Sequence, residues 1–283
     1  MRFNHTNLIP ALPLSWRWLF VILLFLGTHT ILSAQDISVS PARIFFKQSE
    51  PQRLSQRVTL FNSGDKSIIF QSSISDWKRD SLGNKVYFSA GTLSSSNASW
   101  VEVQPNIVEI PAHSKKEVTV ILHVPKDKKP GLTHSMLFLT QLNAQPSRAL
   151  ANGKTNIGVM VKLEFGIHVY YTPLLTELKN LEFINLKEKT VTEGNKKIRR
   201  IEVKIKNTGN VVTDGFLRLE VTDKSSGKEM KLPERAISML PGDEQTIYLD
   251  MPASLKGTYL VVALLDSGEQ TNLKVAKKDI LFN

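Results

Sequence analysis

One stretch of the sequence, residues 157–169, alternates apolar and mostly polar residues over its whole length. Every odd-numbered position from Ile157 to Val169 is apolar, and the residues between them include Lys162 and Glu164. A period of two predicts a β-strand with one apolar face. Ordinary strands have about five or six residues, so this apolar face is longer than one strand usually needs. Either the core of the same chain covers the whole face, or a partner covers part of it.

Short alternating runs recur along the rest of the chain after Gln35. Examples are ISVSPARIFF, QRVTLFNSG, SIIFQSSISDW and KEVTVILHVP. Turn-forming stretches such as NSGDK, SLGN and KKPG separate them. Short strands at this spacing are typical of an antiparallel sandwich. The chain is therefore predicted to be all-β.

The second half of the sequence repeats the pattern of the first. VTLFNSGDKS at 58–67 has a counterpart in VKIKNTGNVV at 203–212, and IVEIPAHSKKEVTVILHVP has one in AISMLPGDEQTIYLDMP. Two similar halves predict two tandem immunoglobulin-like β-sandwiches rather than a solenoid, which needs three or more units. Pro173 interrupts ladder bonding, which places the expected domains at 35–172 and 173–283.

The first 34 residues have the order of a secretory signal peptide. Arg2 and Arg17 precede the apolar run WLFVILLFLG, and the small residues Ser33 and Ala34 follow it. This order predicts export with cleavage after Ala34, and an uncleaved N-terminal anchor is the alternative. After cleavage no membrane insertion is expected. The expected location is the periplasm or cell envelope of a Gram-negative-type bacterium.

Composition excludes several classes of chemistry. The chain has no cysteine, which rules out zinc–thiolate sites, cysteine nucleophiles and a lipid anchor on cysteine. Its net charge of +10 is spread along the sequence, without the basic stripe and interleaved aromatics of a nucleic-acid-binding protein. No nucleophile elbow, phosphate-binding loop or HExxH motif occurs. We therefore predict no enzymatic activity, no metal and no cofactor. An active site assembled from carboxylates between the domains remains a third hypothesis.

Three stretches resemble the N-terminal domain of PapD-like periplasmic pilus-assembly chaperones. ISVSPARIFF is similar to the family's first strand, where an arginine precedes an apolar triplet, and Arg43 has that place. HSMLFLTQLNAQP at 134–146 is similar to the sixth strand and the start of the loop after it. VMVKLEFGIHVYYTP at 159–173 is similar to the seventh strand. The resemblance covers about half of the chain, and the second domain is similar only in being immunoglobulin-like.

The resemblance implies binding of exported pilus or surface protein subunits. In the family, the seventh strand lends alternating apolar side chains to a subunit whose own sandwich lacks a strand. The implied donors are Val159, Val161 and Leu163, with the next three apolar residues in the chain's own core. The apolar face would then be long because it serves two cores. Participation of an outer-membrane usher is left open.

The resemblance also implies an anchor for the subunit's C-terminal carboxylate, in which the family uses an arginine and a lysine. Arg43 fits the first position, but His168 stands at the second. Histidine is mostly neutral at pH 7, since its reference pKa is about 6.5. The family further joins its domains through an acid and an arginine. His134 and Thr172 stand at those places, so that ion pair cannot form.

The alternative hypothesis is a non-chaperone structural or adhesive envelope protein that binds a surface polymer or a scaffold. In that case the chain itself would bury residues 157–163, so the exposure of Val159 and Val161 separates the two hypotheses.

Two further expectations concern packing and order. Trp77 is predicted to be a core residue and Trp100 to pack at a sandwich edge. The polar loop 145–154 is predicted to be a mobile connection that a partner orders.

Overall fold

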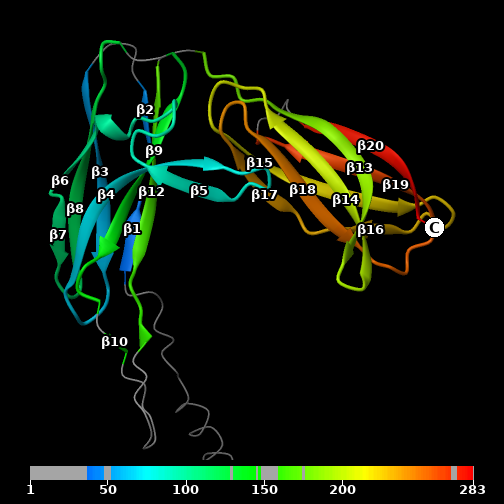
Figure 1. Ribbon diagram of the computed structural model, residues 1–283, viewed down its shortest axis with the longest axis horizontal. Coiled ribbons are helices and arrows are strands. Elements are labelled where there is room, and N and C mark those ends of the chain that lie inside the picture. The colour runs from blue at the N-terminus through cyan, green and yellow to red at the C-terminus, as the bar shows by residue number, and fades with distance from the viewer. Residues whose placement is uncertain are drawn as a thin grey trace, which may run out of the picture. The chain divides into compact units, whose positions relative to one another are not determined.

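The computed structural model describes residues 37–47, 52–127, 130–144, 146–147, 159–173, 176–268 and 273–282. The predicted signal peptide and most of the loop 145–154 lie outside these residues. The described chain consists of β-strands and one short 3-10 helix, η1 (Ala98–Trp100), as Figure 1 shows. No helix in the described ranges is long and apolar enough to cross a membrane. The predicted all-β class is confirmed.

The first sandwich is built from two sheets. One sheet has the order β1 (Ile37–Ser40), β3 (Arg53–Asn62), β8 (Ser114–His123) and β6 (Val101–Gln104). The other has the order β2 (Arg43–Lys47), β12 (Glu164–Thr172), β9 (Thr133–Gln141), β4 (Ile68–Arg79) and β5 (Lys85–Ser89), with β7 (Ile107–Ile110) also paired to β4. All pairs are antiparallel except β2 with β12, which is parallel. This second sheet carries Arg43 on its edge strand β2 and His168 on β12, which lies between β2 and β9.

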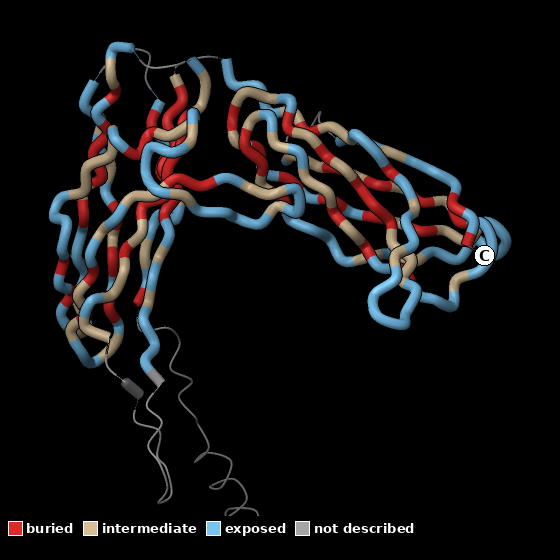
Figure 2. The backbone as a smooth tube through the Cα atoms, in the orientation of Figure 1, coloured by how far each residue is buried: buried red, intermediate tan, exposed pale blue. Residues whose placement is uncertain are grey.

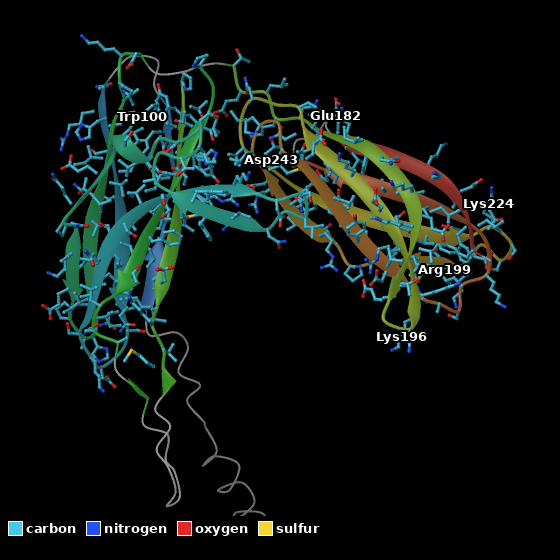
Figure 3. The ribbon with its side chains drawn as sticks, in the orientation of Figure 1. Trp100, Glu182, Lys196, Arg199, Lys224 and Asp243 are labelled. Atoms are coloured by element: carbon cyan, nitrogen blue, oxygen red, sulfur yellow. The ribbon has the colours of Figure 1, made fainter. Side chains whose placement is uncertain are left out.

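The second sandwich also has two sheets. One has the order β13 (Leu181–Glu193), β14 (Lys196–Asn207) and β18 (Glu244–Met251). The other has the order β16 (Glu229–Lys231), β15 (Thr213–Asp223), β19 (Gly257–Asp266) and β20 (Lys274–Phe282), with β17 (Arg235–Met239) paired to β15. Lys196 lies at the turn between the long strands β13 and β14 (Figure 3).

Alternation along the strands builds the core of each sandwich. In β15, for example, Leu217, Leu219 and Val221 are buried, whereas the residues between them are at least partly exposed. Because consecutive side chains of a strand point to opposite faces, one face of each sheet is apolar and closes against the other sheet. Figure 2 shows these buried positions along the strands of both sandwiches. The prediction of two β-sandwiches is confirmed, while the boundary between residues 172 and 173 stays a prediction.

The repeated Asn-Ser/Thr-Gly motif forms a similar structure in each sandwich. In the first, Asn62 is fully buried. Its Nδ2 donates to the carbonyl oxygens of Lys66, Ile110 and Pro111 at 2.8, 3.0 and 3.1 Å. Its Oδ1 accepts a hydrogen bond from the backbone N–H of Gly64 at 3.0 Å. The asparagine therefore joins the turn after β3 to the end of β7.

Asn207 has the same role in the second sandwich. It is fully buried, and its Nδ2 donates to the carbonyl oxygens of Val211 and Met239 at 3.0 and 2.9 Å. Its Oδ1 accepts from the backbone N–H of Gly209 at 2.9 Å. A Cβ on Gly209 would lie 2.1 Å from the carbonyl oxygen of Leu178, so glycine is required there. The repeat in the sequence thus corresponds to a repeated bracing of the fold.

The alternating stretch of residues 157–169 is divided in the structure. Val159–Met160 forms a short strand, β11, which pairs with β10 (Pro146–Ser147), and β12 begins at Glu164. The prediction of one continuous strand over 157–169 is therefore wrong. The physical reason is that a strand needs a continuous ladder of hydrogen bonds. Residues 161–163 have no register pair with a described strand, although the carbonyl oxygen of Leu163 accepts from the backbone N–H of Gln141 in β9 at 2.9 Å.

Candidate functional site

The apolar row along β12 passes from the core into solvent. Ile167 and Val169 are buried in the core of the first sandwich, as predicted. Phe165 and Leu163 are half-buried and pack against the same core. Val161, by contrast, is 62% exposed. The row therefore leaves the core between positions 163 and 161.

Two neighbouring apolar residues before Leu163 are exposed. Met160 is 61% exposed, next to the exposed Val161. The backbone of Val159 belongs to β11, but its side chain lies outside the described part of the structure. Contact with water is unfavourable for two adjacent exposed aliphatic side chains, so covering them with a partner would lower the free energy.

The backbone of β12 is paired unequally on its two sides. On one side, β9 pairs with β12 from Glu164 to Tyr171. On the other side, β2 pairs with it from His168 to Thr172. Among the described residues, 164–167 thus have a strand neighbour on one side and an open edge on the other. An open edge offers unpaired N–H and C=O groups to another strand.

Arg43 and His168, the predicted carboxylate anchor, lie next to each other. They are register partners on the parallel strands β2 and β12, so their side chains share one face of the sheet. Arg43 is already engaged, because its Nη1 lies 2.6 Å from Oδ2 of Asp214 in the second sandwich. By their internal contacts, Ile37–Asn283 form one compact unit. The Arg43 side chain is one-third exposed, at 33%.

His168 is a buried, neutral side chain. It is 8% exposed, and neither ring nitrogen has a hydrogen-bond partner among the described residues. Its ring lies 4.9 Å from that of Trp77 and stacks on Tyr170 at 5.8 Å. Burial, together with the neighbouring positive charge of Lys85, lowers the pKa of His168 to about 4. At neutral pH His168 can therefore supply a hydrogen bond but no charge.

Two basic residues near His168 were missed by the sequence analysis. Arg79 at the end of β4 places its Cζ 5.6 Å from the ring centroid of Trp77. Lys85 at the start of β5 is the register partner of Arg79. Both residues contribute positive potential at His168. The stretch KRDSLGNK signalled a charged hairpin, but its sequence does not indicate which sheet face the charges cover.

Trp77 and Trp100 have different surroundings. Trp77 is 1% exposed, which confirms its predicted burial, and its indole N–H donates to the carbonyl oxygen of Ser135 at 3.2 Å. It belongs to a small outer cluster rather than to the core between the sheets, together with Met136, Tyr170 and Leu240. Trp100, labelled in Figure 3, is half-buried and packs against the main core of the first sandwich.

His134 and Thr172, which replace the family's ion pair, are both buried. The His134 ring lies 5.1 Å from that of Trp77, and burial lowers its pKa to about 4 although Asp76 acts in the opposite direction. These two residues cannot join the sandwiches by charge. Instead, β2 makes two ion pairs with residues after Pro173, from Arg43 to Asp214 at 2.6 Å and from Lys47 to Glu177 at 2.5 Å.

The described residues contain no group of three or more His, Asp or Glu side chains that could hold a metal ion. The remaining histidines after residue 34 are exposed. His113 lies 2.9 Å from Asp65, and His123 lies 2.7 Å from Glu102. These are surface pairs between side chains on neighbouring loops and strands. Around β12 the described residues thus combine the exposed apolar side chains of Met160 and Val161, an open strand edge at 164–167 and nearby basic residues.

Solved pilus chaperones match the chain over most of its length. One match is a chain of the CsuC–CsuE chaperone–tip adhesion subunit pre-assembly complex of Acinetobacter baumannii, with 14% identity, a TM-score of 0.45, and coverage of 86% of this chain and 98% of that one. The Salmonella enterica SafA pilin complex with the SafB chaperone gives 14% identity, a TM-score of 0.43, and coverage of 88% and 97%. The Pseudomonas aeruginosa CupB2 chaperone gives 10% identity, a TM-score of 0.43, and coverage of 87% and 100%.

These solved structures belong to the class of proteins that the three sequence stretches resemble, at 10–14% identity and TM-scores of 0.43–0.45. No protein-family model matches the sequence, and no curated protein matches it significantly. The identities of 10–14% concern the fold alone. The roles of individual residues are argued below from the contacts of this chain.

Proposed function

We propose that this chain is an exported, chaperone-like protein that binds and stabilises fimbrial or surface subunits by donating a β-strand. It would act in the periplasm, without cofactor or covalent step. The observation that carries the proposal is that Val161 is 62% exposed, whereas Ile167 and Val169 in the same apolar row are buried. One apolar row thus begins in the chain's own core and ends where a second polypeptide can complete it.

The open edge of β12 supplies the second half of the interaction. A subunit strand placed along residues 164–167 would extend the sheet on the side that β2 leaves unpaired. Backbone hydrogen bonds would give affinity without sequence preference, and apolar pockets would give specificity. Burying one exposed aliphatic side chain contributes about 1.5–3 kcal/mol before the costs of association. Exposed ion pairs contribute about 0–1 kcal/mol each, so the apolar row would dominate affinity.

The donor positions do not contribute equally in this proposal. Leu163 already packs against the chain's own core. It would therefore bury less additional apolar surface on binding than Val161. Arg43 and His168 would act as the anchor of a carboxylate, with the charge supplied by Arg43. The alternative, a structural envelope protein, requires the chain itself to cover residues 157–163. The exposure of Val161 favours strand donation at this position.

The test is site-specific photocrosslinking in the bacterial envelope. A photoreactive residue is placed at position 161, or at Ile107, which is 53% exposed on β7 of the same sandwich and serves as the matched control. We expect crosslinks from position 161 to an exported subunit, and none to that subunit from position 107. The substitution Val161→Asp should abolish co-purification. If Val161→Asp folds normally and keeps every partner, strand donation is wrong.

A further inference from the structure

The central strand of one sheet in the second sandwich is apolar on both of its faces. Four residues of β19 are buried in the core: Tyr259, Val261, Ala263 and Leu265. The residues between them point away from the core and are aliphatic too, but they are only partly buried: Leu260, Val262 and Leu264. An antiparallel strand with one face in water normally alternates apolar and polar residues. The sequence of β19 therefore indicates that its outer face is covered as well.

Both neighbours of β19 add apolar side chains to this outer face. The strand lies between β15 and β20 (Figure 1), and directly paired residues of adjacent strands share a face. Val275 on β20 pairs with Leu264 and is 57% exposed. Phe216 on β15 is 48% exposed and precedes the buried Leu217. We call the outward side chains of β15, β19 and β20 the β19 face.

The other sheet of the same sandwich has a different outer face. There, charged side chains of β14 form ion pairs with the neighbouring strands. Lys187 on β13 lies 3.0 Å from Glu202, and Lys204 lies 2.6 Å from Glu244 on β18. Such a face is well solvated, whereas a contiguous exposed apolar surface marks an interaction site. The apolar β19 face is thus a feature of one sheet and not of the sandwich in general.

Two opposite charges flank the centre of the β19 face. Glu220 on β15 and Lys277 on β20 are both register partners of Val262, on opposite sides of it. Two strand spacings, about 9–10 Å, separate them, which is too far for an ion pair with each other. Neither makes an ion pair with another described residue, although Lys231 on β16 is also a register partner of Glu220. Each charge is therefore free to meet an opposite charge on a partner.

A second copy of this chain complements this arrangement of charges. When two β19 faces pack with a two-fold axis along β19, each residue of β15 lies over the residue of β20 in the same row of the other copy. Glu220 then lies over Lys277 on both sides of the axis, and Val262 lies over its own counterpart. A two-fold axis across the strands would instead place Glu220 over Glu220. The charges thus select one symmetric arrangement, in which the same surface is used twice.

The neighbouring rows of the β19 face fit the same arrangement. Thr222 and Asp279 flank Leu260, so the hydroxyl of one copy would donate to the carboxylate of the other. Arg218 and Val275 flank Leu264, so the aliphatic stem of the arginine would cover the valine. Sheets that pack face to face keep their strands within about 30° of each other, which the axis along β19 permits.

We propose that the β19 face joins two copies of this chain in a weak symmetric dimer. Three strands about 4.8 Å apart, with the ten residues of β19 at about 3.4 Å each, give a face of roughly 500 Å² per copy. A total near 1,000 Å² is at the lower limit of specific interfaces, so the dimer should dissociate in the micromolar range. The inference goes beyond strand donation, because the interface uses only residues of the second sandwich.

Exchanging the two central charges tests the arrangement. Sedimentation equilibrium of the full chain measures the dissociation constant of the dimer. Glu220→Lys and Lys277→Glu each bring like charges together twice and should weaken the dimer about tenfold or more. The double variant should dimerise as the unaltered chain does. An equal mixture of the two single variants should also form a mixed dimer, because every contact then joins opposite charges. Lys116→Glu, on exposed β8 of the first sandwich, is the control and should have no effect.

The apolar centre of the face is tested in the same measurement. Val262→Asp places two carboxylates over each other and should reduce association about a hundredfold. Thr119→Asp is the matched control, because Thr119 is also a partly exposed, outward residue on a strand with neighbours on both sides. It should leave the dimer intact. Urea unfolding of both variants checks that each is folded.

Three results would overturn the inference. One is an unaltered chain that stays monomeric up to about 1 mM, even if the β19 face then captures a different envelope protein. Another is a dimer that folded Val262→Asp leaves intact, and the third is a double charge variant that fails to restore association. Either of these would mean that the copies meet through another surface. Val161→Asp should dimerise normally, so failure of strand donation and failure of the dimer are separate results.

Discussion

Arg43 and His168 occupy facing positions on the paired strands β2 and β12, yet only one of them is charged at neutral pH. Burial among aromatic rings keeps His168 neutral, whereas a guanidinium stays protonated in proteins. The pair therefore differs from an arginine–lysine pair in both charge and hydrogen-bonding capacity. The nearby strands β4 and β5 carry two further basic residues, Arg79 and Lys85.

Truncating Val161 should separate binding from stability. Val161→Ala removes an exposed side chain, so the free energy of unfolding should change by less than about 0.5 kcal/mol. Its affinity for a subunit should fall about tenfold, since tenfold corresponds to about 1.4 kcal/mol. Leu163→Ala should instead lower the stability by about 1–2 kcal/mol, because Leu163 packs on the core. Urea unfolding and subunit titration check both. Equal losses of stability in the two variants would contradict the division of the apolar row.

The two buried histidines should make the protein less stable in mild acid. The pKa of His134 and that of His168 are about 4 in the folded chain, compared with about 6.5 when unfolded. Between these values the unfolded state binds more protons, so the free energy of unfolding falls as the pH drops from about 6.5 toward about 4. The loss for His134 is at most about 3 kcal/mol.

Urea unfolding at pH 7, 6 and 5 measures this dependence. The double variant His134→Asn/His168→Asn should show a flatter pH profile than the unaltered chain. His113→Asn is the control, because the His113 side chain is 63% exposed, and its profile should match that of the unaltered chain. An unchanged slope in the double variant would assign the acid sensitivity to carboxylates instead.

Removing either buried asparagine should destabilise its own sandwich. Asn62→Ala leaves the carbonyl oxygen of Ile110 buried without this donor, and each such orphaned group costs about 1–3 kcal/mol. Asn207→Ala should have a similar effect through Met239. Asn84→Ala is the control, because Asn84 is exposed in the β4–β5 turn. Hydrogen exchange, read separately for the strands of each sandwich, checks whether the loss is confined to one of them.

Freeing Arg43 from Asp214 should favour carboxylate binding. Both side chains of this ion pair are partly exposed, so Asp214→Asn should change the free energy of unfolding by less than about 1 kcal/mol. The affinity for a free-acid peptide should rise two- to fivefold, because Asp214 no longer competes for the guanidinium. Asp279→Asn, at a surface pair with Lys224, serves as the control. Weaker binding in Asp214→Asn would mean that Asp214 orients Arg43 rather than competing for it.

The predicted residues on β12 show where inference from the sequence ends. The alternation placed Ile167 and Val169 in the core correctly. It could not distinguish Val161 from Leu163, because both are aliphatic residues on the same predicted face. The difference arises where the chain leaves the sandwich, since Leu163 contacts the core and Val161 has no layer above it. Burial is a property of the surrounding layers, which a local pattern does not describe.

The sequence by itself determined the all-β class, the two sandwiches and the repeated asparagine turns. These follow from periodicity and turn chemistry, which act between residues that are near neighbours in the chain. The tertiary structure alone decided which charges surround His168 and that His168 is neutral. Strand β2, the β4–β5 hairpin and strand β12 are far apart in sequence and meet in one sheet. A pKa depends on burial and on charges across space, so it exists only once those strands have assembled.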